Sequence, residues 1–482
     1  MVINSIGRFM VVLALMFLAG CAAVGPNYVP PETAAPGVWY TELKDGLIAQ
    51  KANPETLANW WKTLNDPILS ELIKRAVAGN LDLKKARARV REARAHRNIS
   101  QAPLFPIIDV AGAATRNRIS QERSNLVDYD LYKAGFDASW ELDVFGGVRR
   151  SLEAATASLQ ASQEDLRDAL VSLLSEVALN YLDVRTFQTG LAVAQANLEA
   201  QANTHQFTQS RFEAGLTNEL AVQQAKYNME NTRSKIPILR IGLQRAMNRL
   251  SVLLGQQPGT LHAELQEPRA IPVTPLEVAV GVPAEALRRR PDVRRAERQL
   301  AAQTAQVGVA TADLYPKFRL LGSIGLESLS LGDFFSASGL AYLIGPRITW
   351  PLFNAGAIRS NIEVQSTLQE QALIQYESTV LKALEEVENA LVAYAEEQNR
   401  RQALKASSKA AQRAVALAES QYQAGLTDFT GILDAQRSLL SFQEQLAQSE
   451  GAVTSNLVRL YKALGGGWTS FVKGTGNSQA GQ

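Results

Sequence analysis

The side chains that could carry out chemistry are few and far apart in this 482-residue chain. The three histidines, His96, His205 and His262, are too widely separated in the sequence to form a local metal-ligand pattern. The sequence contains no nucleophile–base motif, phosphate-binding loop or metal-ligand spacing. A single cysteine excludes an intrachain disulfide. We therefore expect neither an enzyme nor a bound cofactor.

The strongest cluster of basic residues does not indicate a nucleic-acid partner. It comprises Arg288, Arg289, Arg290, Arg294 and Arg295, with the acidic residues Glu285, Asp292 and Glu297 between or beside them. Over the whole chain, 49 Lys and Arg balance 47 Asp and Glu, and the net charge is +2. Such a balance gives no general attraction to a polyanion. A solvated helix start is the simpler interpretation of the arginines.

The lone cysteine, Cys21, has the surroundings of a lipid-modification site. Arg8 precedes an apolar run over residues 9–18, and Leu18-Ala19-Gly20 leads directly into Cys21. This is the pattern of a secretory signal peptide, here residues 1–20, and it is too short for a membrane span. Leu-Ala-Gly-Cys resembles the bacterial lipobox, which implies cleavage before Cys21, a covalent lipid on its thiol and, with Ala22 next, sorting to the outer membrane. The alternative is an ordinary signal with an incidental cysteine.

Two identical tetrapeptides show how the rest of the chain is organised. Ala214-Gly215-Leu216-Thr217 recurs as Ala424-Gly425-Leu426-Thr427, so that the two glycines lie 210 residues apart. The same offset also aligns many other identical residues without a gap, among them Asp82 with Asp292, Pro106 with Pro316, Gly135 with Gly345, Trp140 with Trp350, and Gly255 with Gly465. The sequence therefore predicts two structural repeats of 210 residues, and the two glycines are expected at the tips of helical hairpins.

Proline-free, alanine-rich stretches on both sides of each tip predict long helices. We expect helices over 147–213 and 357–423, each followed by a return helix, over 218–254 and 428–464. In the first, leucines recur every seven residues at Leu152, Leu159 and Leu166, which predicts supercoiled packing against neighbouring helices. At 1.5 Å per residue, such a helix spans roughly 100 Å. Shorter helices are expected over 67–79, 81–101 and 291–312.

Between the short and long helices of each repeat, two segments alternate like strands. In residues 132–144 the even positions are apolar, including Phe136, Trp140 and Leu142, whereas the odd positions include Lys133 and Asp137. Strict alternation with aromatic residues is typical of a transmembrane β-strand, which has lipid on one face and water on the other. Strands are expected over 105–118, 132–144, 315–328 and 340–352. A half-buried soluble sheet is the alternative.

These elements divide the chain into six parts. The parts are the signal peptide (1–20), a lipidated N-terminal tether (21–66), repeat 1 (67–255), a linker (256–275), repeat 2 (276–465) and a flexible C-terminus (466–482). Four membrane strands cannot close a barrel, and open edges in hydrocarbon leave backbone groups unsatisfied. Two chains would give eight strands and three would give twelve, and only the larger barrel leaves an open lumen.

Several short motifs together resemble one family. They are Gly25-Pro26-Asn27-Tyr28, Trp60-Trp61, Asp66-Pro67, Arg290-Pro291-Asp292-Val293, Leu314-Tyr315-Pro316, Trp350-Pro351-Leu352-Phe353 and Leu433-Asp434-Ala435-Gln436-Arg437. The combination is similar to the TolC-like outer-membrane efflux proteins, especially the lipidated OprM and NodT type. The resemblance implies a mainly α-helical homotrimer with a twelve-stranded transmembrane β-barrel and a long coiled-coil α-barrel. It also implies a Gram-negative outer membrane, a periplasmic adaptor and an inner-membrane resistance-nodulation-division pump as partners.

The resemblance further implies roles for two sets of residues. Asp434 and Arg437, three residues apart on one helical face, would form a charged periplasmic gate. Their counterparts in the first repeat, Gln224 and Tyr227, are uncharged. The adaptor-docking residues would be those at the tips, namely Gly215, Leu216, Thr217, Gly425, Leu426 and Thr427. A duct for secreted proteins and a non-conducting, lipid-anchored periplasmic scaffold are the alternatives.

Overall fold

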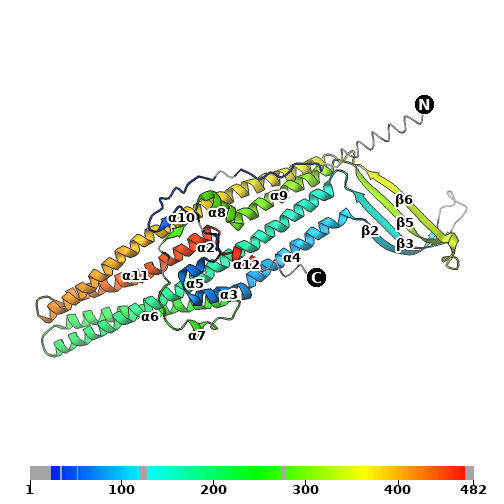
Figure 1. The fold of residues 1–482 in the computed structure, drawn as a ribbon. Coiled ribbons are helices and arrows are strands. Elements are labelled where there is room, and N and C mark those ends of the chain that lie inside the picture. The colour runs from blue at the N-terminus through cyan, green and yellow to red at the C-terminus, as the bar shows by residue number, and fades with distance from the viewer. Residues whose placement is uncertain are drawn as a thin grey trace. The chain divides into compact units, whose positions relative to one another are not determined.

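The computed structural model describes residues 23–32, 35–51, 53–118, 128–272, 275 and 277–472. The expected signal peptide over 1–20 and the expected lipid site Cys21 lie outside these residues. The chain forms two compact units, each drawing on both halves of the sequence. Unit 1 comprises Met1–Glu32, Arg89–Gln163 and Arg295–Ser378, and unit 2 comprises Thr33–Ala88, Glu164–Arg294 and Thr379–Gln482. Figure 1 labels the elements.

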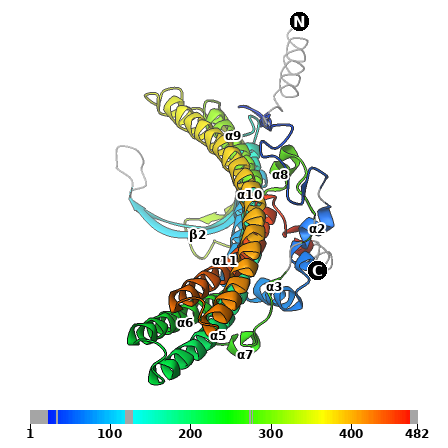
Figure 2. The ribbon, with the colours of Figure 1, turned by 90° about the vertical axis from the view of Figure 1, so that its left-hand side faces the viewer.

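Unit 1 contains an antiparallel four-stranded sheet in the order β2-β3-β5-β6. The strands are β2 (Ile107–Arg118), β3 (Asp128–Leu142), β5 (Lys317–Ser328) and β6 (Leu340–Thr349). Their register joins residues of like character into rows: Val110 pairs with Phe136, Phe136 with Ile324, and Ile324 with Tyr342. All four side chains are more than half exposed. The strands curve (Figure 2), and β2 and β6 are the edges of the sheet within the described residues.

The strand ends differ from those expected, for identifiable reasons. Strands β2 and β5 begin two residues late, after Pro106 and Pro316, and β6 ends at Thr349, just before Trp350-Pro351. Proline cannot donate to the ladder, so it borders β2 and β5, whereas Pro346 is tolerated within β6 because β6 is an edge strand of the described sheet. Strand β3 begins at Asp128 rather than 132, because the ladder with β2 continues to the Arg118–Asp128 pair. It ends at Leu142 rather than 144, where Asp143 starts the turn into the next helix.

The helices that follow the strands have nearly the expected bounds. They are α5 (Gly147–Glu213), α6 (Glu219–Leu253), α10 (Ala357–Gln423) and α11 (Phe429–Ala463), with α4 (Leu81–Gln101) and α9 (Pro291–Ala312) before the strands. The return helices α6 and α11 are one residue shorter at each end than expected, because residues 218 and 428 are N-caps and residues 254 and 464 are C-caps. The bounds of α5, α6 and β2 recur in α10, α11 and β5 at an offset of 210 residues.

Unit 2 has a large hydrophobic core that includes part of the expected tether. Residues 53–65 fold into α2 (Pro54–Ala58) and the 3-10 helix η1 (Trp60–Leu64), which precede α3 (Pro67–Gly79). Trp60 and Trp61 are almost fully buried, and the Trp60 ring stacks on Tyr461 at 5.8 Å. The end of the tether is therefore part of the core, because these large apolar side chains are stabilised by burial. Farther towards the N-terminus, β1 (Leu47–Ile48) pairs in parallel with β4 (Val278–Ala279).

The linker and the C-terminal segment also make specific contacts. Linker helix α7 (His262–Leu265) is attached to α5 by the fully buried Arg185, which donates to the Glu267 carbonyl at 3.0 Å. Helix α8 (Pro283–Arg289) then leads into α9. Near the C-terminus, α12 (Thr469–Val472) follows Trp468, whose ring lies 4.8 Å from the Arg167 guanidinium. The segment over 466–472, expected to be flexible, is therefore ordered by aromatic packing, while 473–482 lie outside the described residues.

Within the described ranges, no helix combines the length and hydrophobicity needed to cross a membrane. In the same ranges, no group of three or more His, Cys, Asp or Glu residues could hold a metal ion.

The contact between the ends of α3 and α6 gives a test of packing in unit 2. A Cβ on Gly79 would lie 2.1 Å from the Leu254 carbonyl oxygen, and one on Gly255 would lie 2.4 Å from the Gly79 oxygen. Since backbone must move to make room, we expect Gly79→Ala to lower the free energy of unfolding by at least about 2 kcal/mol. The loss of stability is measured by thermal melting, with the helical circular dichroism signal as the probe of unfolding.

Gly190→Ala is the matched control, because Gly190 also lies in a helix, α5. A Cβ there would meet only Leu239 Cδ2 at an ordinary 3.5 Å. This variant should be neutral or more stable by about 0.5–1 kcal/mol, because alanine favours the helix. Equal destabilisation of both variants would contradict the close contact at Gly79.

Candidate functional site

The two hairpin tips in unit 2 have the same backbone structure. Gly215 follows α5 with φ of +68°, and Gly425 follows α10 with φ of +70°. The Gly215 amide donates to Phe212 at 2.9 Å and the Leu216 amide donates to Arg211 at 2.8 Å, and the second tip repeats both bonds. This is the Schellman arrangement, in which glycine takes the left-handed conformation at the helix end. The glycines therefore form helix-ending turns, as the sequence predicts.

The side chains at the tips are presented to solvent. Leu216 is 65% exposed and Leu426 is 79% exposed, whereas Thr217 and Thr427 are partly buried. The return helices start differently: Asn218 accepts a hydrogen bond from the Ala221 amide at 3.0 Å, whereas Asp428 accepts one from the Thr430 hydroxyl at 2.5 Å. The Thr430 bond lowers the pKa of Asp428. Each tip turn thus exposes one leucine, and the N-cap residue of the second return helix is charged whereas that of the first is neutral.

Asp434 and Arg437 lie on the exposed side of α11, as their spacing predicts. Arg437 Nη1 is 3.7 Å from Asp434 Oδ1, and the two side chains are 44% and 78% exposed. Arg437 also donates to the Tyr227 hydroxyl and, at 3.4 Å, to Asn228 Oδ1 on α6. Its guanidinium lies 5.1 Å from the centre of the Tyr227 ring, a cation–π geometry. Arg437 therefore connects the return helices of the two hairpins, a contact that the sequence did not reveal.

A small apolar cluster holds the two hairpins together near their tips. It contains Ala221 and Ala225 from α6, Tyr422 from α10, and Phe429, Ile432 and Leu433 from α11. The Arg211 guanidinium of α5 lies 4.9 Å from the Tyr422 ring centre and 5.8 Å from that of Phe207. Within the described residues, neither Arg211 Nε nor the Tyr422 hydroxyl has a hydrogen-bond partner. Contact between the hairpins thus combines apolar packing with incompletely satisfied polar groups.

Incompletely satisfied polar groups also occur on α5 and α11, where Gln201 and Gln436 are buried. Gln201 is only 2% exposed, and neither polar atom of its amide has a partner among the described residues. Gln436 donates to the Thr204 hydroxyl at 2.9 Å, while its Oε1 has no partner in the described part of the chain. A buried amide without hydrogen bonds costs roughly 1–3 kcal/mol. Separation of the hairpins would return these groups to water.

We therefore expect Gln201→Leu to stabilise the contact between the hairpins. Removal of the unpaired amide should raise the free energy of unfolding by about 1–3 kcal/mol, and thermal melting measures the change. Gln206→Leu, at an exposed position of α5, is the control and should have little effect. Lower stability of the Gln201 variant would show that the amide is satisfied in the folded protein.

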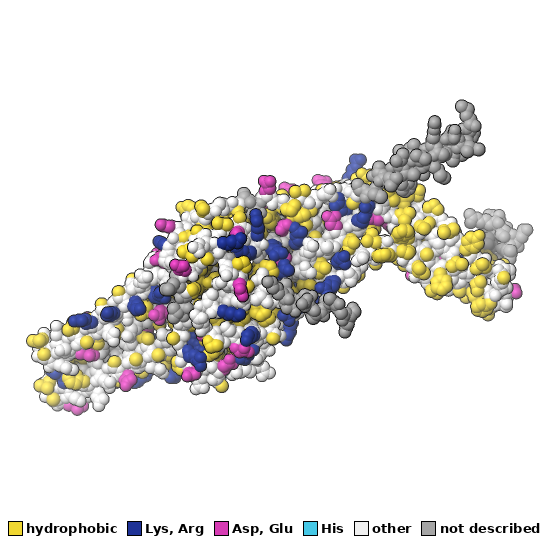
Figure 3. Space-filling view, in the orientation of Figure 1, with side chains coloured by type: hydrophobic (Ala, Val, Ile, Leu, Met, Phe, Trp, Pro, Cys, Tyr) yellow, Lys and Arg dark blue, Asp and Glu magenta, His cyan; other side chains and the backbone are white. Residues whose placement is uncertain are grey.

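The sheet in unit 1 has one apolar and one charged face. Figure 3 shows hydrophobic side chains covering the strands on the visible face, whereas Lys, Arg, Asp and Glu gather over the helices. The odd-numbered residues form ion pairs across β3 and β5: Lys133 is 3.0 Å from Glu327, and Arg319 is 3.1 Å from Glu141. A sheet with an exposed apolar face and a charged opposite face is suited to separate lipid from water.

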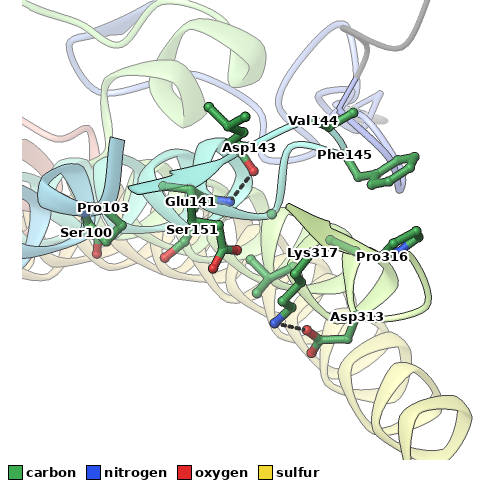
Figure 4. A pocket seen from close by; sticks show the side chains of 15 residues that line it. Ser100, Pro103, Glu141, Asp143, Val144, Phe145, Ser151, Asp313, Pro316 and Lys317 are labelled. Atoms are coloured by element: carbon green, nitrogen blue, oxygen red, sulfur yellow. Dashed lines mark hydrogen bonds and ion pairs between the residues drawn. The ribbon is translucent and has the colours of Figure 1, made fainter. Parts of the chain in front are cut away.

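The junction between strands and helices in unit 1 is rigidly built. Asp143 accepts hydrogen bonds from the backbone amides of Val148 (Figure 4) and Arg149, each at 2.9 Å, and so caps α5. Lys317 Nζ is 2.9 Å from Asp313 Oδ1 on the opposite strand–helix connection. Phe145 stacks on Tyr315 with ring centres 4.5 Å apart. Aromatic residues at this level are typical of the membrane–water interface.

Comparison with solved structures finds this fold in an outer-membrane channel. The chain is similar to the outer-membrane channel OprN, with a TM-score of 0.88 and 36% sequence identity. The match covers 93% of this chain and 100% of that one. A sheet with one apolar face, followed by long helical hairpins, thus defines a protein of the outer-membrane channel class.

The chain belongs to the outer membrane efflux protein family. The model of that family matches twice, at residues 72–256 and 282–466. Nodulation protein T of Rhizobium leguminosarum bv. trifolii is 32% identical over 95% of this chain and 97% of its own length. The toluene efflux pump outer membrane protein TtgF of Pseudomonas putida is 30% identical over 94% of this chain and 95% of its own. The resemblance inferred from the motifs is thereby confirmed.

Proposed function

We propose that this protein is the outer-membrane exit duct of a tripartite efflux pump in a Gram-negative bacterium. The observation that carries the proposal is a sheet with an exposed apolar face and a charged opposite face, in a chain that belongs to the outer membrane efflux family. Related proteins named as efflux pump outer membrane proteins support the same assignment. The duct is passive, and an inner-membrane pump supplies the energy for export.

The open sheet edges argue for a homotrimer. Backbone groups on β2 and β6 that face hydrocarbon without partners would each cost several kcal/mol, so other copies must pair with them. Eight strands from two copies form a barrel filled by side chains, whereas twelve strands from three copies leave a lumen. Three copies therefore suit a duct, with the apolar rows facing lipid and the Lys133–Glu327 and Arg319–Glu141 pairs lining the lumen.

The repeated architecture supports the same design. The matching bounds of α5 with α10 and of α6 with α11, together with the two matches of the family model at the same offset, indicate two structural repeats from a duplicated unit. Each repeat would contribute two strands and one helical hairpin. Three chains would therefore place six similar hairpins around one axis, so that the helical part has nearly sixfold symmetry. The hairpins would form the coiled-coil α-barrel that extends into the periplasm.

Partners and anchoring follow from this function. A lipid on Cys21 would anchor each chain to the outer membrane. The exposed leucines at the tips would dock a periplasmic adaptor, which links the duct to an inner-membrane pump of the resistance-nodulation-division type. Asp434 and Arg437 would hold the periplasmic end closed until adaptor and pump open it. The exported substrate is then selected outside this protein.

Ion conductance of the purified protein in planar lipid bilayers tests the proposal. A duct should insert and give stepwise currents, and crosslinking in detergent should give a species of three chains. A protein that binds membranes without conducting would be a periplasmic scaffold instead. Conductance accompanied by copurification with a protein-secretion system, rather than with an adaptor and pump, would identify a secretion duct.

A further inference from the structure

The first described residues of the chain are held by one buried arginine. The Arg150 side chain, on the first turn of α5, is only 5% exposed. Its Nε donates to the Val24 carbonyl at 3.0 Å, and its Nη2 donates to the carbonyls of Ala23 and Gly25 and, at 2.8 Å, to Asn27 Oδ1. Its Nη1 is paired with Glu153 at 2.8 Å. One guanidinium thus binds three successive backbone carbonyls and a side-chain amide of an extended segment.

Glycines make room for this segment where it crosses the body. Gly25 has φ of +86°, and a Cβ on it would lie 2.4 Å from the Gly308 Cα. A Cβ on Gly146 would lie 2.4 Å from the Ala23 Cβ, and one on Gly308 would lie 2.9 Å from Arg150 Cδ. These are contacts that any larger residue would prevent. Gly146, Gly308 and Arg150 therefore form a site shaped for residues 23–27, and Gly25 is the residue of the segment that fits against Gly308.

Further contacts continue on both sides of this site. The Val24 amide donates to the Phe145 carbonyl at 3.0 Å, which fixes the segment beside the end of β3. The Tyr28 hydroxyl donates to Glu297 at 3.2 Å, and the Arg298 guanidinium lies 5.4 Å from the Tyr28 ring centre. Burial, with the Glu297 charge next in importance, raises the pKa of Tyr28, so its hydroxyl keeps the proton that it donates.

The site lies at the level of the aromatic residues that border the strands. The Trp140 and Trp350 indoles donate to the carbonyls of Leu104 and Leu314 at 3.1 and 3.0 Å. Trp350 is 55% exposed and Phe353 is 90% exposed. Tryptophans with a satisfied N–H at one end of membrane strands are typical of the lipid headgroup region. Residues 23–27 are therefore held where the apolar surface of the sheet ends.

We propose that Arg150, with Gly146 and Gly308, forms a docking site for the lipidated N-terminal segment of the chain's own mature form, and that Gly25 of the segment fits this site. The inference rests on the proposed lipid at Cys21, which lies two residues before Ala23. Two residues span at most about 7 Å, so the acyl chains start close to the aromatic border. The site holds the segment whether or not the lipid is present, and it thereby fixes where the acyl chains enter the membrane.

Hydrogen–deuterium exchange of peptides covering residues 22–30 tests this site in the full-length protein reconstituted in liposomes. Arg150→Met should exchange at least about tenfold faster, because bonds from a charged donor to three carbonyls are lost. Gly25→Val, a change within the segment itself, should also raise the exchange rate. Valine disfavours the positive φ of residue 25, and its side chain would clash with Gly308. Gly37→Val is the matched control, because a Cβ on Gly37 meets nothing within 4 Å.

The unlipidated variant Cys21→Ser separates the site from the lipid. We expect its exchange over residues 23–28 to stay within about twofold of the wild type. Unchanged exchange in both Arg150→Met and Gly25→Val would overturn the proposal. Exchange that rises in Cys21→Ser as much as in Arg150→Met would also overturn it, since the lipid would then hold the segment. Bilayer conductance of the wild-type protein tests the proposed duct independently. If the protein does not conduct, the proposed function is contradicted, whereas the exchange rates still decide whether the docking site exists.

Discussion

Removal of the Asp434 and Arg437 side chains together is expected to open the periplasmic end of the channel. The exposed Arg437–Asp434 pair contributes at most about 1 kcal/mol, while the hydrogen bonds of Arg437 to Tyr227 and Asn228 add to it. At about 1 kcal/mol per chain, the three copies in the proposed trimer would favour the proposed closed state by roughly 3 kcal/mol. The double variant should therefore shift the closed–open equilibrium about 100-fold toward open.

Single-channel recording in planar bilayers measures this shift as a higher open fraction and conductance. Glu230→Ala with Arg233→Ala is the matched control, because this pair is also an exposed i,i+3 ion pair on a return helix, with side chains 44% and 55% exposed. The Arg233 guanidinium also lies 4.0 Å from the Met229 sulfur, which belongs to the same helix α6. An unchanged closed state in the Asp434 and Arg437 variant would contradict the gate.

The contact between Arg437 and Tyr227 shows where sequence reasoning stops. The spacing of Asp434 and Arg437 correctly places both on one helical face, since that depends only on the period of the helix. For Tyr227, the counterpart of Arg437 in the first repeat, the sequence indicated only that this position lacks the charge present in the second repeat. Its contact with Arg437 depends on the relative register of α6 and α11, which heptad spacing within one helix does not determine.

The same distinction holds elsewhere in the fold. The ends of the expected helices follow from local chemistry, such as the left-handed Gly215 and Gly425, and agree with the sequence prediction to within one residue. The prolines before Ile107 and Lys317 also act locally, but the predicted strands included them, so these strand ends were two residues off. The burial of Gln201 and the multiple bonds of Arg150 were not predictable. A glutamine or an arginine in a polar helix gives no sequence signal of the neighbours it will meet. Periodicity therefore predicts elements, whereas contacts between elements need the structure.

Loss of adaptor docking is the second large effect that we expect, from changes at the two tips. Gly215→Val and Gly425→Val together place a β-branched residue at positive φ, at a cost of about 1–2 kcal/mol per tip. Because a Cβ at either glycine meets nothing within 4 Å, the strain distorts the turn without a clash in the core. Chemical crosslinking to an adaptor should fall at least about tenfold, whereas the proposed trimer should remain intact on native gels.

Two further variants separate docking from folding at the tips. Gly259→Val introduces valine at a φ of +99° in the linker, also with open space around it, and should leave crosslinking unchanged. Leu216→Asp with Leu426→Asp keeps the glycine turns but replaces the exposed apolar side chains, so it should also abolish crosslinking. If the glycine variants lose the trimer while the aspartate variants still crosslink to the adaptor, the tips serve only to turn the chain. If the glycine variant and the aspartate variant both lose crosslinking while Gly259→Val keeps it, the adaptor recognises the exposed leucines, which the glycine turns hold in place.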